Sequence, residues 1–121
     1  MALDTRIPTN SDYTPVIPFS AAASEVAYAA NPEIVLDAVL ENNYKFAQLT
    51  GAMTVDVDTT KGKDFDKVIM SFAADGTQRV VTFGTGFISS GTLTIPASKK
   101  AIVTGVVIDG EVRIASREIQ A

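Results

Sequence analysis

The chain has 121 residues, of which 46% are hydrophobic and 20% charged, and its formal net charge is −4. It contains neither His nor Cys, which excludes imidazole bases, thiol nucleophiles, the common zinc sites and disulfide bonds. The acidic balance argues against nucleic-acid binding, and no apolar run is long enough to span a bilayer. We therefore expect one soluble domain that has no enzymatic activity, no cofactor and no membrane partner.

Residues 1–32 differ in composition from the rest of the chain because they contain four of the five prolines. X-Pro steps favour extended backbone, and proline is excluded from central strands. Residues 20–32 are compatible with a short helix or with an extended path. We predict an extended N-terminal arm over residues 1–32 that docks on its own domain, a sister subunit or another protein, the alternative being a flexible terminus. Its candidate partner-binding residues are Ile7, Tyr13, Val16, Ile17, Phe19 and Tyr28.

Residues 33–121 are predicted to form the folded domain, because apolar residues recur there with period two. The run 34–40 is ambiguous between strand and helix. The runs 44–50 and 53–58 alternate more clearly, and the second places Met53, Val55 and Val57 on one face. This alternation is typical of a strand with one face in water. The stretch 59–64 is predicted to be a polar loop.

Two Asp-Gly pairs predict two β-hairpins, since glycine adopts the positive φ of tight turns without steric cost. The first joins a strand at 68–72 to a strand at 80–83 through Asp75–Gly76, and the second joins 101–108 to 112–117 through Asp109–Gly110. A further strand at 92–95 is stopped by proline. Many short strands ended by Gly or Pro indicate an all-β domain, which we expect to be an antiparallel β-sandwich or a jelly-roll-like fold.

The predicted strand 101–108 is apolar on both faces, which is typical of a strand covered on both sides. We therefore expect one face to pack in the core and the other against a second layer or subunit. The candidate subunit-interface residues are Ile102, Val103, Val106, Val107 and Ile108.

Three other features are candidates for a functional site. The segment 84–91 follows a strand and is rich in glycine, but it lacks the spacing of a phosphate-binding loop and is predicted to be a tight turn. The only acidic cluster could supply oxygen ligands to a calcium ion, although interleaved lysines favour a solvated strand face and turn instead. Phe87 is a candidate partner-binding aromatic residue outside the core. The acidic cluster consists of Asp56, Asp58, Asp64 and Asp66.

Residues from about 44 to 117 resemble a β-rich module of structural proteins from tailed phages, among them head fibres, capsid-decorating proteins and tail-fibre segments. The resemblance is carried by the strand end at 46–51, the strand starts at 53–55 and 68–72, and the stretch DGTQRVVTFG at 75–84. The closing strand at 103–108, before Asp109–Gly110, also matches, whereas the loops match poorly. The resemblance implies a virion component, usually a trimer, that is attached to a capsid or a tail.

Composition, arm and resemblance together predict a non-enzymatic virion protein located on the capsid surface. We expect it to decorate or cement the capsid, or to form the base of a head fibre, through its N-terminal arm. Its expected partners are the major capsid protein or another virion protein, and two sister copies in a homotrimer. The alternatives are a tail or baseplate component and a carbohydrate-binding module, the last weakened by the absence of Trp.

Overall fold

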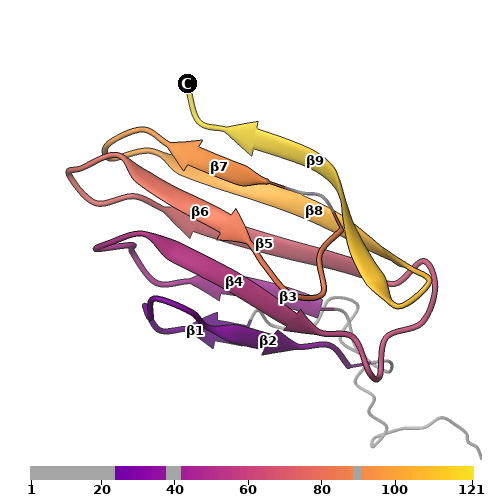
Figure 1. Cartoon of the computed structure of the whole chain (residues 1–121). Coiled ribbons are helices and arrows are strands. Elements are labelled where there is room, and N and C mark those ends of the chain that lie inside the picture. Colours follow the sequence, from indigo (N-terminus) through magenta and orange to yellow (C-terminus); the bar gives the residue numbers. More distant parts are fainter. Residues whose placement is uncertain (1–23, 38–41, 89–90) are drawn as a thin grey trace, which may run out of the picture.

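The computed structural model describes residues 24–37, 42–88 and 91–121, which contain nine β-strands and no helix. The strands form two sheets that pack as a sandwich (Figure 1). The five-stranded sheet contains, in spatial order, β1 (Ser24–Val26), β3 (Asn42–Phe46), β5 (Lys67–Ala73), β8 (Lys100–Ile108) and β9 (Glu111–Ile119). The four-stranded sheet contains β2 (Glu33–Val35), β4 (Met53–Asp58), β6 (Arg79–Phe83) and β7 (Thr92–Ile95). The predicted all-β sandwich is thus confirmed.

Both sheets are mixed, with parallel and antiparallel strand pairs. The prediction that the sandwich is antiparallel is therefore wrong. From β1 to β6 the chain crosses to the other sheet after every strand, so sheet neighbours are two strands apart in sequence and run parallel. These parallel pairs are β1·β3, β3·β5, β2·β4 and β4·β6. Only the last three strands reverse within a sheet, in the antiparallel pairs β6·β7, β5·β8 and β8·β9.

The first predicted hairpin is wrong because β5 and β6 belong to different sheets. Asp75 and Gly76 lie in the connection between β5 and β6, which crosses from one sheet to the other. Neither residue has a positive φ. A two-residue hairpin turn of type I′ needs positive φ at both central residues. The connection is held by the Asp75 carboxylate, which accepts two hydrogen bonds from the Arg79 guanidinium at 2.9 and 2.8 Å.

The second predicted hairpin is confirmed. Asp109 and Gly110 have φ values of 53° and 78°, as a type I′ turn requires, and β8 pairs with β9 along its whole length. The register shifts by one residue between Thr104 and Gly105, which forms a β-bulge. The bulge determines which side chains of the β9 residues beyond it lie on the inner side of the sheet and which on the outer side.

The beginning of the described chain, in which Pro32 directly precedes β2, forms one edge of each sheet. β1 is the first strand of the five-stranded sheet and β2 the first of the four-stranded sheet, which fits the exclusion of proline from central strands. The ambiguous run at 34–40 therefore begins as a strand. Its remainder, residues 38–40, lies outside the described residues, as do residues 20–23 of the alternative helix.

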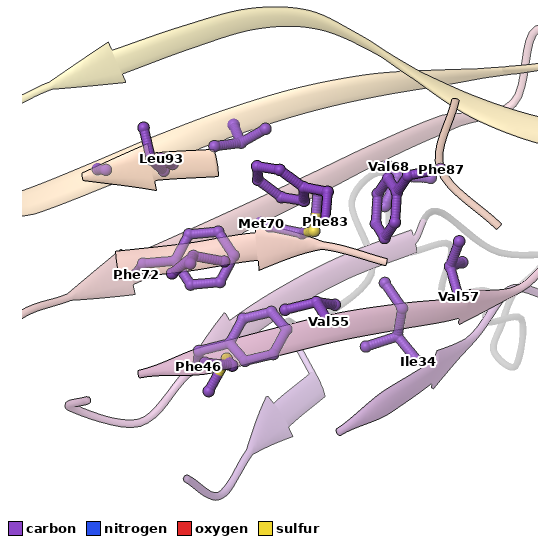
Figure 2. Packing of buried hydrophobic residues seen from close by; sticks show 14 of the residues in the cluster. Ile34, Phe46, Val55, Val57, Val68, Met70, Phe72, Phe83, Phe87 and Leu93 are labelled. Carbon is purple, nitrogen blue, oxygen red and sulfur yellow. The ribbon is translucent and has the colours of Figure 1, made fainter. Parts of the chain in front are cut away.

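The core lies between the sheets and is built from the inward side chains of alternating strands. In β4, the inward residues Met53, Val55 and Val57 are at most 4% exposed, as the period-two pattern predicts. Aromatic rings link the layers, since Phe72 of β5 lies edge-on to Phe83 of β6, with centroids 6.4 Å apart (Figure 2). Such contacts between rings stabilise the core beyond their buried area.

Candidate functional site

Most of the predicted arm lies outside the described residues, including the five candidate anchors Ile7, Tyr13, Val16, Ile17 and Phe19. Tyr28 is described, and it binds its own domain. Its ring packs against the core, and its hydroxyl donates a hydrogen bond to the Ala52 carbonyl at 2.8 Å. Tyr28 therefore helps to fasten the N-terminal segment to the sandwich and is a poor candidate for contact with a separate protein.

Residues 24–32 run along the edges of the two sheets. The Val26 carbonyl accepts a hydrogen bond from the Ala47 N–H at 2.8 Å on the five-stranded sheet. On the four-stranded sheet, the Ala30 and Pro32 carbonyls accept hydrogen bonds from backbone N–H groups of β4 at 2.8 and 3.0 Å. The part of the predicted arm that the structure describes is thus extended and adds to the sheets of its own domain.

The five predicted interface residues of β8 divide between two faces. Val103 and Val107 are fully buried and point into the core, so the prediction that they contact another subunit is wrong. Ile102, Val106 and Ile108 lie on the opposite face, where Ile102 is 49% exposed and the other two are half-buried. Within the described part of the chain, no second layer covers this side of the strand.

The surface around these three residues is the outer face of the five-stranded sheet. On β5, the outward residue Ile69 is 40% exposed and lies opposite Thr104 of β8. Charged residues of β5 and β9 flank this apolar centre. We call the following set the outer face: Lys67, Ile69, Ser71, Lys100, Ile102, Thr104, Val106, Ile108, Glu111, Arg113, Ser116 and Glu118.

The opposite side of the sandwich has a different character. Outward positions of the four-stranded sheet are mainly threonine and aspartate, such as Thr54, Asp56, Thr82 and Thr94. A polar outer face is the ordinary state of a sheet that meets water on one side. The apolar centre of the outer face therefore marks one side of the molecule for contact with another surface.

A shallow groove of about 420 Å³ continues the outer face toward the C-terminus. It lies where β8 begins and β9 ends, and it shares Lys100, Ile102 and Glu118 with the outer face. The Lys99 ammonium group donates a hydrogen bond to the Ala121 carbonyl at 2.8 Å near this end of the hairpin. The groove is open and mixed in polarity, so it extends a contact surface and does not form an enclosed ligand pocket.

The four acidic residues that are candidate cation ligands order separate turns. Oδ1 of Asp56 accepts a hydrogen bond from the Thr85 N–H at 2.8 Å, and Oδ1 of Asp64 accepts one from the Asp109 N–H at 2.9 Å. Asp66 accepts one from the Lys63 N–H at 2.8 Å. Hydrogen bonds from the Thr60 side chain and backbone hold the pKa of the Asp58 carboxyl below its ordinary value. Among the described residues, no group of three or more acidic residues is placed to hold a metal ion.

The glycine-rich segment after β6 packs directly against β4. A side chain at Gly84 would collide with Asp56, and one at Gly86 would collide with the Val57 backbone. A phosphate would meet the Asp56 carboxylate at this position and be repelled, so the tight-turn interpretation of the described residues 84–88 is favoured. Phe87, predicted to be a partner contact, is 8% exposed and lies 5.1 Å from the Phe83 ring, so that prediction is wrong.

Sequence reasoning misses the residues that complete the outer face: Ile69, Arg113 and Glu118. Ile69 follows Lys67 on the outward positions of β5, and an isoleucine at a position expected to face water is a usable signal. The place of Arg113 follows from the Asp109–Gly110 hairpin, whereas that of Glu118 depends on the β-bulge in β9, which the sequence does not reveal. Arg117, also on β9, lies on the inner side, where its guanidinium stacks over the Phe83 ring at 5.4 Å.

No helix among the described residues is long and apolar enough to cross a membrane. Comparison of the sequence with models of protein families and with curated proteins found no match.

Proposed function

We propose that the protein is a non-enzymatic structural component of a tailed-phage virion that attaches to the capsid surface through its N-terminal arm. Its role is to decorate or cement the capsid, or to form the base of a head fibre, and its main partner is the major capsid protein. Two features support the proposal. One is the resemblance of residues 44–117 to phage structural modules, and the other is the path by which the chain enters the sandwich.

The observation that carries the proposal is the path of residues 24–32. This segment already adds to two sheet edges by backbone hydrogen bonds, first along β3 and then along β4. An extended segment that pairs with a sheet edge is a common mode of protein recognition, in which backbone bonds give affinity and side chains fill pockets. The preceding residues contain three prolines and several apolar side chains, which favour an extended path, and we infer that they use the same mode on a partner.

The large number of copies on a capsid makes weak attachment sufficient. Each of Ile17 and Phe19 would contribute roughly 1.5–3 kcal/mol if its side chain became fully buried on a partner. Several chains on neighbouring sites would add avidity to this modest single contact. An arm with a few apolar anchors therefore suits a protein that fastens to a repeating shell.

The carbohydrate-binding alternative has less support than virion attachment. A sheet that binds sugars needs exposed aromatic side chains that stack on the rings, and the outer face presents isoleucine and valine among its described residues. The exposed aromatic residue Phe65, at 75%, lies in the loop before β5. No observation favours this alternative over attachment.

The experiment measures attachment to purified phage particles that lack the protein. The full chain is mixed with these particles, and its co-sedimentation is compared with that of Ile17→Asp/Phe19→Asp. We expect the double variant to bind at least about tenfold more weakly, because two apolar anchors are lost. The melting temperature of both chains is measured as well, so that weaker binding at an unchanged melting temperature is assigned to the arm.

Val35→Asp is the matched control, since Val35 is an exposed apolar residue of the sandwich itself, 54% exposed. This variant should bind particles like the unchanged chain. Undiminished binding of the arm variant would contradict the role of the arm. Failure of the unchanged chain to bind particles would contradict capsid attachment altogether.

A further inference from the structure

The side chains of the outer face form ordered rows across β5, β8 and β9. The central row joins Ile69, Thr104 and Ser116, which lie opposite one another in the sheet. The row on one side joins Ser71, Ile102 and Glu118, and the row on the other side joins Lys67, Val106 and Arg113. Each flanking row therefore has an apolar residue on β8, but the charge on β9 is negative in one row and positive in the other.

These charges have no partner within the described part of the chain. Neither Glu118 nor Arg113 makes an ion pair or a side-chain hydrogen bond there, and both are exposed. On β3 and β1, the row of Ile102 continues to Lys45 and Glu25, which are direct neighbours of opposite charge. The unbalanced charges of the outer face are thus concentrated on either side of the central row.

We propose that a second copy of this chain packs on the outer face about a two-fold axis that runs along the central row. A rotation of 180° about this axis turns the face over and exchanges the two flanking rows, while each strand stays opposite itself. Glu118 then faces Arg113 of the second copy, and Ile102 faces Val106 of the second copy. By symmetry each of these contacts occurs twice, and Ile69 lies at the axis, opposite its own equivalent.

The next rows outward fit the same rotation. Lys100 and Gln120 form one outer row, and Ile108 and Glu111 form the other. The axis brings these two rows together, so that Lys100 lies near Glu111 of the second copy. Opposite charges therefore meet both in the flanking rows and in the outer rows. These charge pairs determine the relative orientation of the two copies more than they increase the affinity.

Other symmetries do not give this complementarity. A two-fold axis parallel to the strands would place each row against the same row, so Arg113 and Lys67 would meet like charges. A three-fold arrangement joins two different patches of the surface. Outside the outer face, the large exposed apolar residues of the described chain are scattered: Val35, Phe65 and Ile119. The outer face thus favours pairing with itself over the trimer that the phage resemblance implies.

The size of the face predicts a dimer of modest stability. The three strands of the outer face span about 14 Å, and the nine residues of β8 extend about 30 Å. Two such faces in contact bury roughly 900 Å², which is below the range of stable interfaces and within that of weak, transient ones. We therefore expect a dimer that dissociates on dilution. The inference does not depend on virion attachment, so pairing and attachment can fail separately.

Light scattering of the full chain over a range of concentrations tests the pairing. The expected mass at high concentration is twice that of the 12.8-kDa chain. Arg113→Glu should raise the dissociation constant at least about tenfold, because two like-charge pairs then face each other. The exchange Arg113→Glu/Glu118→Arg should restore the dimer, a rescue that a general effect on folding would not produce.

Lys63→Glu is the matched control, because it changes the net charge equally but lies in the loop before β5. It should leave the dissociation constant unchanged. A mass of three chains, a monomer at every concentration, or failure of the double exchange to restore pairing would each overturn the proposal.

A single introduced cysteine gives a second measurement that does not depend on charge. The chain contains no Cys, so Ile69→Cys places one thiol at the proposed axis. Two packed sheets lie about 10 Å apart, and a short bis-maleimide can join two thiols that point toward each other across this gap. We expect covalent dimers from Ile69→Cys and almost none from Val35→Cys, and equal yields from the two variants would overturn the proposed axis.

Discussion

At the scale of single residues, the segment after β6 approaches the backbone of β4 closely. Gly86 has a φ of 91°, and a β-carbon at this position would collide with the Val57 backbone. The Thr85 carbonyl also accepts a hydrogen bond from the Val57 N–H at 2.8 Å. This contact holds the segment that carries Phe87 into the core, so its geometry affects both stability and packing.

Gly86→Ala should lower the free energy of unfolding by well over about 1 kcal/mol, since it combines an unfavourable φ with a steric collision. Gly76→Ala is the matched control, because a β-carbon there meets no atom within 4 Å and its φ is not positive. That change should have almost no effect. Urea denaturation of the two variants measures the difference, and equal stabilities would contradict the described contact.

The Asp75–Arg79 ion pair predicts a pH dependence. Hydrogen bonds from the Arg79 guanidinium hold the pKa of the Asp75 carboxyl below its ordinary value. Because the pKa is lower in the folded state, this stabilisation is complete above the unfolded pKa of about 3.9 and is lost as the pH falls through the folded value. Asp75→Asn should therefore be less stable than the unchanged chain at neutral pH, and the gap should close in acid.

Thermal unfolding of both chains from neutral pH down to about pH 2 measures this gap, and the range includes the ordinary carboxyl pKa. The substituted amide would keep an oxygen for the Thr77 N–H, which the Asp75 carboxylate binds at 3.1 Å, so the comparison removes the charge and one of the two hydrogen bonds from Arg79. A gap that stays constant over the whole range would contradict the assignment of the stabilisation to the ion pair.

At the scale of elements, the sequence indicates which residues form strands better than it indicates how the strands pair. Alternation correctly separates Met53, Val55 and Val57 from their outward neighbours, because burial on one face of a strand imposes period two. The partner of each strand depends on whether a turn stays in one sheet. Asp75–Gly76 and Asp109–Gly110 have the same residue types, yet only the second has positive φ and closes a hairpin.

The same limit explains which parts of the candidate surface can be predicted. The outward residues Ile102, Val106 and Ile108 belong to a run that carries apolar residues on both of its faces. The sequence does not say which of its two faces is the inner one, so the prediction assigns Val103 and Val107 to the surface together with them. On β9, the outward place of Glu118 depends in addition on the extra residue at the bulge, which is a consequence of strand pairing.

The side chain of Arg117 connects the end of β9 to the four-stranded sheet, and this contact predicts the effect of a substitution at Arg117. Its guanidinium stacks over Phe83 of β6 and donates a hydrogen bond to the Thr92 carbonyl at 2.7 Å. Arg117→Lys loses the planar group, and we expect faster amide hydrogen exchange in residues 114–119 and a loss of about 1 kcal/mol in stability. Arg113→Lys on the outer face should have little effect on either quantity. A larger effect from Arg113→Lys than from Arg117→Lys would contradict the role assigned to Arg117.

At the scale of the whole molecule, the β1 and β2 edges and the outer sides of the two sheets differ in composition and in what they contact. The N-terminal segment enters at the β1 and β2 edges, and the polar face of the four-stranded sheet meets water. The outer face of the five-stranded sheet combines an apolar centre with opposite charges. We therefore infer a small assembly part in which the arm attaches the domain and the outer face pairs it with a second copy.

Capsid attachment is the central claim, and locating the protein on purified virions tests it most directly. Virions of the phage that, on this proposal, encodes the chain are labelled with gold-conjugated antibodies against residues 24–121 and viewed by electron microscopy. Gold distributed over the capsid shell is the predicted result. Gold confined to the tail, or particles without gold although the protein is present in the infected cells, would contradict the account.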